Sequence, residues 1–489
     1  MKNTKFEFFF RSLIAKNMEK PEHRLWKFVE NFSEQSTIHG VNIIRMKKLH
    51  ILERIFWVVA VILAATGAIT LAKSNWTRYS ANPTVVSIQK DYRNWENAFP
   101  AATGCLVDKV DITNAEKFIH KTWNITKIDS KYPYYLDFVK TVANVSYNSL
   151  SYFGQFENDT DLNNVDLVKL AINVHPAISG NLVTFQTKHK TDWQLILTEL
   201  GVCLTVNSKF AELLTINTDD TNVVKSGTYV ETLRCHYLNG LCYARYDSDP
   251  SRPINYYIHS YLEVVHATYN SFYPVEESEE LEINYRMIET VSSPDIRYLT
   301  PSQRKCHFDN EPLTTDVPVY GTSICYIICR HKLSLKLCGC KPFFYHFLGG
   351  KVCDIRGLLC LSKYANRIMQ PPSQIGCKCP QPCELITYLP QIPQYTKWEH
   401  GYFDSRITFR WGLLPPTTKY RRDILFGFGD LIVSIGGTVA LFLGISFISI
   451  IEIIFLFIES ILKQYMDRDE TPTKKLFVAV GKNNNIDME

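Results

Sequence analysis

Cysteine is absent from both ends of this 489-residue chain, because all fourteen cysteines lie between Cys105 and Cys383. Charged residues are absent from two long apolar runs, residues 55–72 and 431–451. An uncharged apolar run of about 18 residues or more is a candidate for a helix that crosses a membrane. The sequence therefore predicts two membrane spans, with every cysteine in the loop between them.

Other absences exclude whole classes of protein. Residues 1–20 contain charges and lack the apolar core of a secretory signal, so we expect the first span to start membrane insertion. The net charge of +4 is close to neutral for this length and gives no reason to expect a nucleic-acid partner. The loop histidines, such as His120, His175, His189 and His236, have no spaced Ser, Asp or Glu partners. We therefore expect neither an enzyme nor a cofactor nor a fixed metal site.

Basic residues flank both runs on the sides of the chain ends. They are Arg45, Lys47, Lys48 and Arg54 before the first run, and Lys463, Arg468, Lys474, Lys475 and Lys482 after the second. Because basic residues stay on the cytoplasmic side, both termini are predicted to be cytoplasmic in a multi-pass protein of the plasma membrane. The predicted segments are a cytoplasmic N-terminus (1–54), a first span (55–72), an extracellular domain (73–430), a second span (431–458) and a cytoplasmic C-terminus (459–489).

An even number of cysteines in a compartment predicted to be oxidising indicates seven disulfides. Ten of the fourteen lie within residues 306–383, which is typical of a segment stabilised by disulfides. Counting leaves the pairing open. The short motifs Cys338–Cys340 and Cys377–Cys379 also have the compactness of zinc ligands, an interpretation that an oxidising compartment disfavours. Four sequons, at Asn75, Asn124, Asn144 and Asn158, predict glycosylation of the same domain.

Three shorter stretches carry a local prediction. Residues 22–38 have apolar residues at helical spacing and stop at His39-Gly40, which predicts an amphipathic helix with a glycine cap. Residues 182–185 are β-rich and predict a strand, whereas residues 193–200 predict a helix.

Several motifs then occur in one order along the chain. They are His39-Gly40, Phe99-Pro-Ala-Ala-Thr-Gly-Cys105, Gly201-Val-Cys203-Leu-Thr-Val-Asn207, a ladder of ten cysteines from Cys306 to Cys383 followed by Tyr388, and Gly436-Gly437-x3-Leu441-Phe-Leu-Gly444-Ile-Ser446 with Glu452. On these motifs, nearly end to end, the chain resembles the degenerin/epithelial sodium channel superfamily, and within it the insect pickpocket-type subunits.

The resemblance implies an α+β membrane protein. Two transmembrane helices would flank a large disulfide-rich extracellular domain with a β-sheet palm and a helical thumb at 306–383. Three subunits would surround one pore, as a homotrimer or as a heterotrimer with sibling subunits. The implied disulfides are Cys105–Cys203, Cys235–Cys242, Cys306–Cys383, Cys325–Cys379, Cys329–Cys377, Cys338–Cys360 and Cys340–Cys353.

The second span carries a polar stripe that a lipid-facing anchor does not need. Its members are Asp430, Ser434 and Thr438, four residues apart, and then Ser446, Ser449, Glu452 and Glu459 in a shifted register. No Lys or Arg occurs between Asp430 and Glu459, so a pore lined by this stripe would favour cations over anions.

The register shift lies where the resemblance implies a helix break and the selectivity filter, at Gly444, Ile445 and Ser446. Glycine and serine lack bulk there, and backbone carbonyls of an unwound helix can turn toward an ion. The resemblance also makes His39-Gly40 a gating motif and Val433 a gate position, where the family usually has a smaller residue.

Two alternatives stay open on residues alone. The small residues Gly436, Gly437 and Ala440 are equally typical of tight helix packing, and His39-Gly40 is equally typical of a plain helix cap.

The sequence therefore predicts a subunit of a trimeric, amiloride-sensitive, sodium-selective cation channel of the plasma membrane. Gating through the extracellular domain, in a sensory or epithelial setting, is expected. The expected partners are sodium ions, membrane lipid and sibling subunits. A two-span scavenger-type receptor with a ligand-carrying loop is the main alternative, although its spans need no Gly-x-Ser break. An ATP-gated two-span channel fits less well, because it needs a lysine-rich nucleotide site and ten loop cysteines in another order.

Overall fold

The computed structural model describes residues 38–45, 49–177, 179–186, 192–214, 232–249, 252–459 and 462. The chain forms two compact units: a helical unit made of Met1–Pro83 and Leu425–Glu489, and a central unit made of Thr84–Ile424. The helix predicted over 22–38 lies almost wholly outside the described residues, as do most of the segments 1–54 and 459–489.

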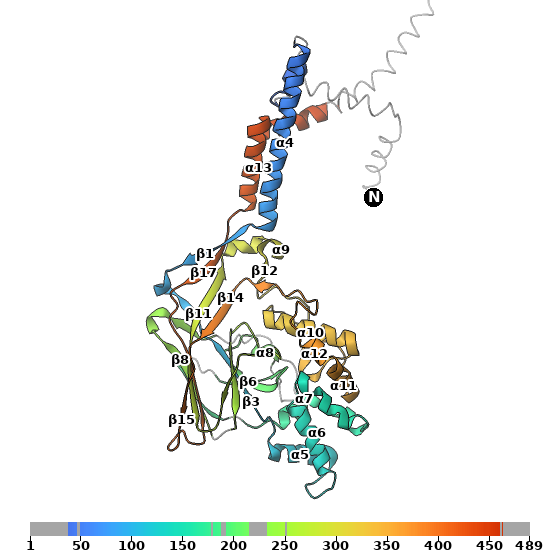
Figure 1. Ribbon diagram of the computed structural model, residues 1–489, viewed down its shortest axis with the longest axis vertical. Helices are drawn as coiled ribbons and strands as arrows, with labels where there is room; N and C mark the ends of the chain where they lie inside the picture. The colour runs from blue at the N-terminus through green and yellow to red at the C-terminus, as the bar shows by residue number, and fades with distance from the viewer. Residues whose placement is uncertain are drawn as a thin grey trace, which may run out of the picture. The chain divides into compact units, whose positions relative to one another are not determined.

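The central unit contains two large sheets (Figure 1). The first has the order β1-β17-β11-β16-β8-β4, with β14 and β15 also paired to β11. Its strands are β1 (Thr84–Gln89), β4 (Gly180–Thr184), β8 (Cys242–Ser248), β11 (Glu279–Ser292), β14 (Leu385–Pro390), β15 (Gln394–Lys397), β16 (Ile407–Leu413) and β17 (Lys419–Ile424). Strand β11 runs parallel to β16 and β17, and the other pairs are antiparallel.

The second sheet is antiparallel, with the order β10-β9-β3-β6-β5. Its strands are β3 (Ala101–Leu106), β5 (Gln194–Thr198), β6 (Gly201–Val206), β9 (Ile254–His259) and β10 (Tyr273–Val275). Two short pairs, β2 (Glu96–Ala98) with β7 (Arg234–His236) and β12 (Cys306–His307) with β13 (Gln381–Pro382), complete the strands of the described residues.

The helix predicted over 193–200 was wrong, because Gln194–Thr198 form strand β5 and the next two residues form the turn to β6. Strand β5 pairs with β6 along its length and buries Ile196 and Leu197. A short apolar run does not distinguish a buried strand from a helix, so the tertiary pairing decided the outcome. The strand predicted at 182–185 is confirmed as β4.

The core that joins the two sheets is aromatic. Tyr256 of β9 stacks on Phe409 of β16 with ring centroids 4.1 Å apart, and Phe409 stacks on Trp411 at 4.9 Å. Every residue of β16 except Arg410 is buried, so both faces of this strand are covered.

A second core is surrounded by helices. They are α5 (Ile112–Trp123), α6 (Tyr132–Ala143), α7 (Leu167–Asn173), α8 (Ala211–Leu214), α10 (Thr322–Cys338), α11 (Ile355–Lys363) and α12 (Ala365–Ile368), with the 3₁₀ helices η2 (Tyr147–Phe156) and η6 (Phe343–Tyr345). Aspartates begin three of them: Asp111, Asp166 and Asp354 accept the first free backbone N–H groups of α5, α7 and α11. Gly339, with φ of 71°, ends α10 in the left-handed conformation that suits glycine.

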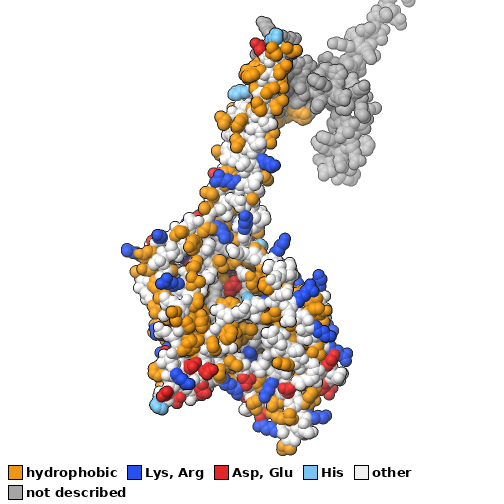
Figure 2. All heavy atoms as spheres, viewed as in Figure 1, with side chains coloured by type: hydrophobic (Ala, Val, Ile, Leu, Met, Phe, Trp, Pro, Cys, Tyr) orange, Lys and Arg blue, Asp and Glu red, His pale blue; other side chains and the backbone are white. Residues whose placement is uncertain are grey.

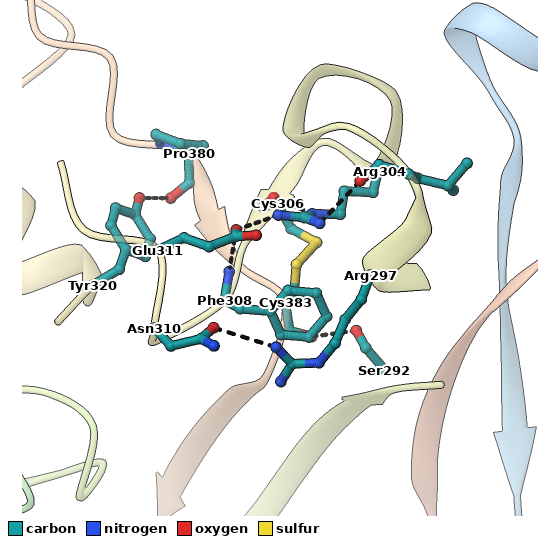
Figure 3. The surroundings of a disulfide bond; sticks show 11 residues. Ser292, Arg297, Arg304, Cys306, Phe308, Asn310, Glu311, Tyr320, Pro380 and Cys383 are labelled. Atoms are coloured by element: carbon teal, nitrogen blue, oxygen red, sulfur yellow. Dashed lines mark hydrogen bonds and ion pairs between the residues drawn. A yellow bond between two sulfur atoms is a disulfide. The ribbon is translucent and has the colours of Figure 1, made fainter. Parts of the chain in front are cut away.

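The structure joins all fourteen cysteines in seven disulfides, and the pairs are those that the resemblance implies. The sulfurs of Cys338, Cys340, Cys377 and Cys379 are therefore not available to zinc. Cys306–Cys383 closes the disulfide-rich segment beside helix α9 (Pro301–Arg304) and the 3₁₀ helix η5 (Pro294–Tyr298). Figure 3 shows the ion pair of Arg304 with Glu311 and the hydrogen bond from Ser292 Oγ to the Cys383 carbonyl, which hold this end in place.

The helical unit contains α3 (Val41–Arg45), α4 (Ile51–Ala81), α13 (Phe428–Leu443) and a last helix, Phe447–Glu459. Helices α4 and α13 lie side by side (Figure 1), and Gly67 of α4 marks the close approach. An ideal Cβ at Gly67 would lie 2.8 Å from Cε1 of Phe442, so only glycine fits this position without a shift.

Candidate functional site

Helix α4 is the one helix in the described ranges that is by itself long and apolar enough to cross a membrane. It has 31 residues, which corresponds to a length of about 46 Å at 1.5 Å per residue. The predicted first span, 55–72, lies inside it. Its large apolar side chains are exposed rather than packed, for example Leu63 at 65% and Ile69 at 66%, which is costly in water and natural in lipid.

The second apolar run forms a broken helix. Helices α13 and Phe447–Glu459 satisfy the same test together, with a bend of 74° between them. The intervening residues are Gly444, Ile445 and Ser446, the three for which the resemblance implies the filter. Gly444 has φ of 67° and donates its N–H to the carbonyl of Ala440, a left-handed helix cap that glycine adopts without penalty.

Serine begins the helix on the far side of the break. The Ser446 hydroxyl lies 3.2 Å from the Ser449 backbone nitrogen, and the Ser446 nitrogen lies 3.3 Å from the Ser449 hydroxyl. This reciprocal arrangement is a capping box, which satisfies N–H groups that the break leaves without helical partners. The break is therefore built into the sequence at both of its ends.

The histidine-glycine motif fills the space beside this break. The backbone N–H of His39 donates to the carbonyl of Leu443, the last residue of α13, at 3.1 Å. An ideal Cβ at Gly444 would lie 2.5 Å from Nδ1 of His39, so the imidazole occupies the space that any side chain at 444 needs. The two motifs lie about 400 residues apart in sequence and form one site.

Gly40 fixes the same segment to α4. It has φ of 83°, and an ideal Cβ there would lie 2.7 Å from Cγ2 of Val61. Both the backbone conformation and the close approach favour glycine. Helix α3 starts at the next residue, so Gly40 directly precedes a helix, whereas the helix over 22–38 that Gly40 was predicted to cap lies almost wholly outside the described residues.

The predicted polar stripe is partly engaged inside the subunit. Asp430 accepts the backbone N–H of Gly427 at 2.8 Å and caps α13, and Thr438 donates to the carbonyl of Ser434 at 2.7 Å. Val433 is 74% exposed, Ser449 is buried, and Glu452 is half-buried. Among the described residues, no atom lies within 4 Å of an ideal Cβ at Gly436 or Gly437, so these residues give no close packing partner for the two glycines.

The central unit contains a buried ionic network that the sequence analysis missed. Arg330 of α10 and Glu199, in the turn between β5 and β6, form an ion pair at 2.7 Å with both side chains 1% exposed. Tyr345 donates to Glu199 at 2.5 Å, and the backbone N–H of Ala267 donates to it at 2.7 Å. Glu199 and Arg330 are 131 residues apart, so no motif of neighbouring residues predicts that they form an ion pair.

A second carboxylate caps α10 from outside the helix. Glu263 accepts the backbone N–H groups of Thr322 and Ser323 at 3.2 and 2.7 Å, and Ser323 Oγ accepts the N–H of Val264 in return. Burial raises the pKa of Glu263 above its usual value, and these hydrogen bonds offset only part of that rise. The start of α10 is thus fixed to the segment that follows β9.

The four predicted glycosylation positions differ in accessibility. Asn124 and Asn158 are exposed, with Asn124 in a left-handed turn after α5. Asn144 is half-buried, and its Oδ1 accepts the N–H of Lys109 at 3.1 Å. Asn75 lies within α4. Asn124 and Asn158 are therefore the most accessible of the four positions.

Comparison with known proteins gives consistent matches. A family model described as "Amiloride-sensitive sodium channel" matches residues 32–456. The chain is 22% identical over 509 residues to "Sodium channel protein Nach" of Drosophila melanogaster, covering 93% of this chain and 90% of that protein. It is 22% identical over 481 residues to "Pickpocket protein 28" of the same species, covering 87% and 77%.

One solved structure overlaps more weakly. The alignment with a proton-activated chloride channel covers 85% of this chain and 98% of the channel's chain, with a TM-score of 0.25 and 6% sequence identity. That similarity is too low to bear on the fold.

Proposed function

The chain belongs to the amiloride-sensitive sodium channel family, within the degenerin/epithelial sodium channel superfamily, and we propose that three such subunits surround one sodium-selective pore. This is a family of ion channels, not of enzymes. The observation that carries the proposal is the break at Gly444–Ser446, which His39 packs against.

The break supplies the groups that a filter needs. Unwound backbone at 444–446 has carbonyl groups that are not all used in helical hydrogen bonds. Three copies of this segment around an axis would form rings of oxygen that replace the water shell of a sodium ion. Gly444 keeps the ring free of side chains, and the capping box of Ser446 with Ser449 holds it in place.

The polar stripe supplies the field. Asp430 and Glu452 lie on either side of the break, and the sequence has no Lys or Arg between Asp430 and Glu459. Such a wall attracts cations and repels anions. Val433 and Thr438 would line the wall above the filter, with Val433 at the gate.

The remaining proposals concern placement. Helix α4 and the broken second run cross the plasma membrane, both termini are cytoplasmic, and the central unit is extracellular and receives the gating stimulus. Amiloride blocks the pore, and the trimer contains identical or sibling subunits. The break between α13 and Phe447–Glu459 favours the channel over the scavenger-receptor alternative, since a receptor anchor needs no break.

The test combines expression with thiol labelling. The subunit is expressed alone and with sibling subunits, and amiloride-sensitive sodium current is recorded. Because every native cysteine is in a disulfide, an engineered cysteine is the only free thiol of the chain. Ser434→Cys should be modified by a charged thiol reagent that changes the current.

Ile432→Cys is the matched control, because two residues on a helix are about 200° apart and place it on the opposite face. Equal modification of both positions, or no current in any combination despite delivery to the cell surface, would count against a pore and favour the receptor.

A further inference from the structure

The disulfide-rich segment carries a charge that the chain as a whole does not. Between Thr322 and Cys383 the sequence has nine Lys and Arg residues and a single acidic residue, Asp354, against a net charge of only +4 for the chain. Figure 2 shows Lys and Arg side chains along the edge of the central unit over α10 and α12. The segment therefore presents a local positive field.

Four of these cations are exposed around one groove. They are Lys332 and Lys336 of α10, Arg367 of α12, and Lys378 in the loop that follows. Lys332 and Lys336 are four residues apart and so lie on one face of α10. Within the described ranges no carboxylate forms a salt bridge with any of the four.

The floor of the groove is apolar and rigid. Ile328, Leu333 and Ile375 line it, with the disulfides Cys325–Cys379 and Cys329–Cys377 beneath. The two disulfides tie the loop at 375–378 to α10, so the groove exists before any ligand binds. Its volume of about 440 Å³ lies in the range of small-molecule sites.

We propose that this groove binds a small organic anion with an apolar body, of the carboxylate, sulfate or sulfonate class. The apolar floor contacts the body, and the cations contact the charged group. An inorganic anion fits less well, because it would leave the apolar floor exposed to water. An uncharged ligand also fits less well, because it would not neutralise the four neighbouring positive charges. This inference does not depend on the proposed pore, because binding is measured without current.

The experiment uses the full chain in nanodiscs of zwitterionic lipid, with empty nanodiscs as blank. The probe is 2-naphthalenesulfonate, followed by saturation-transfer NMR and titration. Lys332→Gln with Lys336→Gln is the test variant; both positions are exposed and glutamine is a good helix former, so the fold is retained. Lys351→Gln, an exposed lysine of the same segment outside the groove, is the matched control.

We expect saturable binding that weakens about tenfold in the double variant and stays at the parental value in Lys351→Gln. Raising the salt from about 0.05 M to about 0.5 M should also weaken it, since exposed charges are screened. Equal affinity in the double variant would overturn the site. Sodium sulfate and a hexaglutamate peptide are then tested as competitors of the probe. If either binds the groove as tightly as 2-naphthalenesulfonate does, the assignment to a small amphiphilic anion is overturned.

Discussion

Replacing Gly444 by alanine tests the site at its tightest point. Two effects oppose the change. A residue with a Cβ at φ of 67° costs about 1–2 kcal/mol. The new Cβ would also lie 2.5 Å from Nδ1 of His39, so the imidazole must shift out of the space beside the break, at an overpacking cost of about 1 kcal/mol or more.

Together these effects disfavour the observed break by about 2–3 kcal/mol, or roughly 30-fold to 150-fold in its population. If the break is the conducting filter, the Gly444→Ala channel should pass at least tenfold less sodium current at equal surface density. Gly444→Asn separates the two causes, because asparagine tolerates the left-handed conformation but still overlaps His39. We expect Gly444→Asn to be impaired less than Gly444→Ala but still to pass less current than the parent, because only the overlap with His39 remains.

Gly437→Ala is the matched control. Its Cβ would meet no atom of the described residues within 4 Å, and the residue lies inside α13, where alanine is the better helix former by about 1 kcal/mol. Current should therefore stay near the parental value. Parental current in Gly444→Ala would refute the reasoning. An equal loss in Gly437→Ala would instead assign the small residues to packing between subunits.

Three further outcomes are expected. Arg330→Met leaves the buried Glu199 carboxylate without its ion pair and should destabilise the central unit by about 3–5 kcal/mol. The double variant Arg330→Met with Glu199→Gln should recover part of this lost stability. If thermal unfolding shows that the losses of the two single variants simply add, the two residues are not coupled. Val433→Ala should lower the resting leak of the channel in patch recordings, and equal leak would remove the gate role. Burial lowers the pKa of His175 and His259 to about 4, so below pH 6.5 the unfolded state binds more protons than the folded state. The free energy of unfolding should therefore fall as the pH is lowered from 6.5 toward 4, by up to about 1.4 kcal/mol per pH unit for each histidine. A melting temperature that is unchanged between pH 7 and pH 5 would be incompatible with this.

The sequence by itself determined the features that depend on neighbouring residues. The apolar run at 55–72 predicted the helix that became α4, because the length of an uncharged run is a local property. The polar stripe changes register near Gly444, and the helix breaks there. Gly444 ends α13 in the left-handed conformation, and Ser446 caps the start of the next helix. Motif order supplied the disulfide map, which counting alone left open.

Only the tertiary structure decided which distant groups meet. Residues 193–200 became a strand because β6 was available as a partner. His39 packs on Gly444, Glu199 pairs with Arg330, and the cations around the groove are brought together by α10, α12 and a loop. Local sequence sets what each segment prefers, but burial and pairing between segments far apart in the chain select among those preferences, because their combined free energy exceeds the small differences in local propensity.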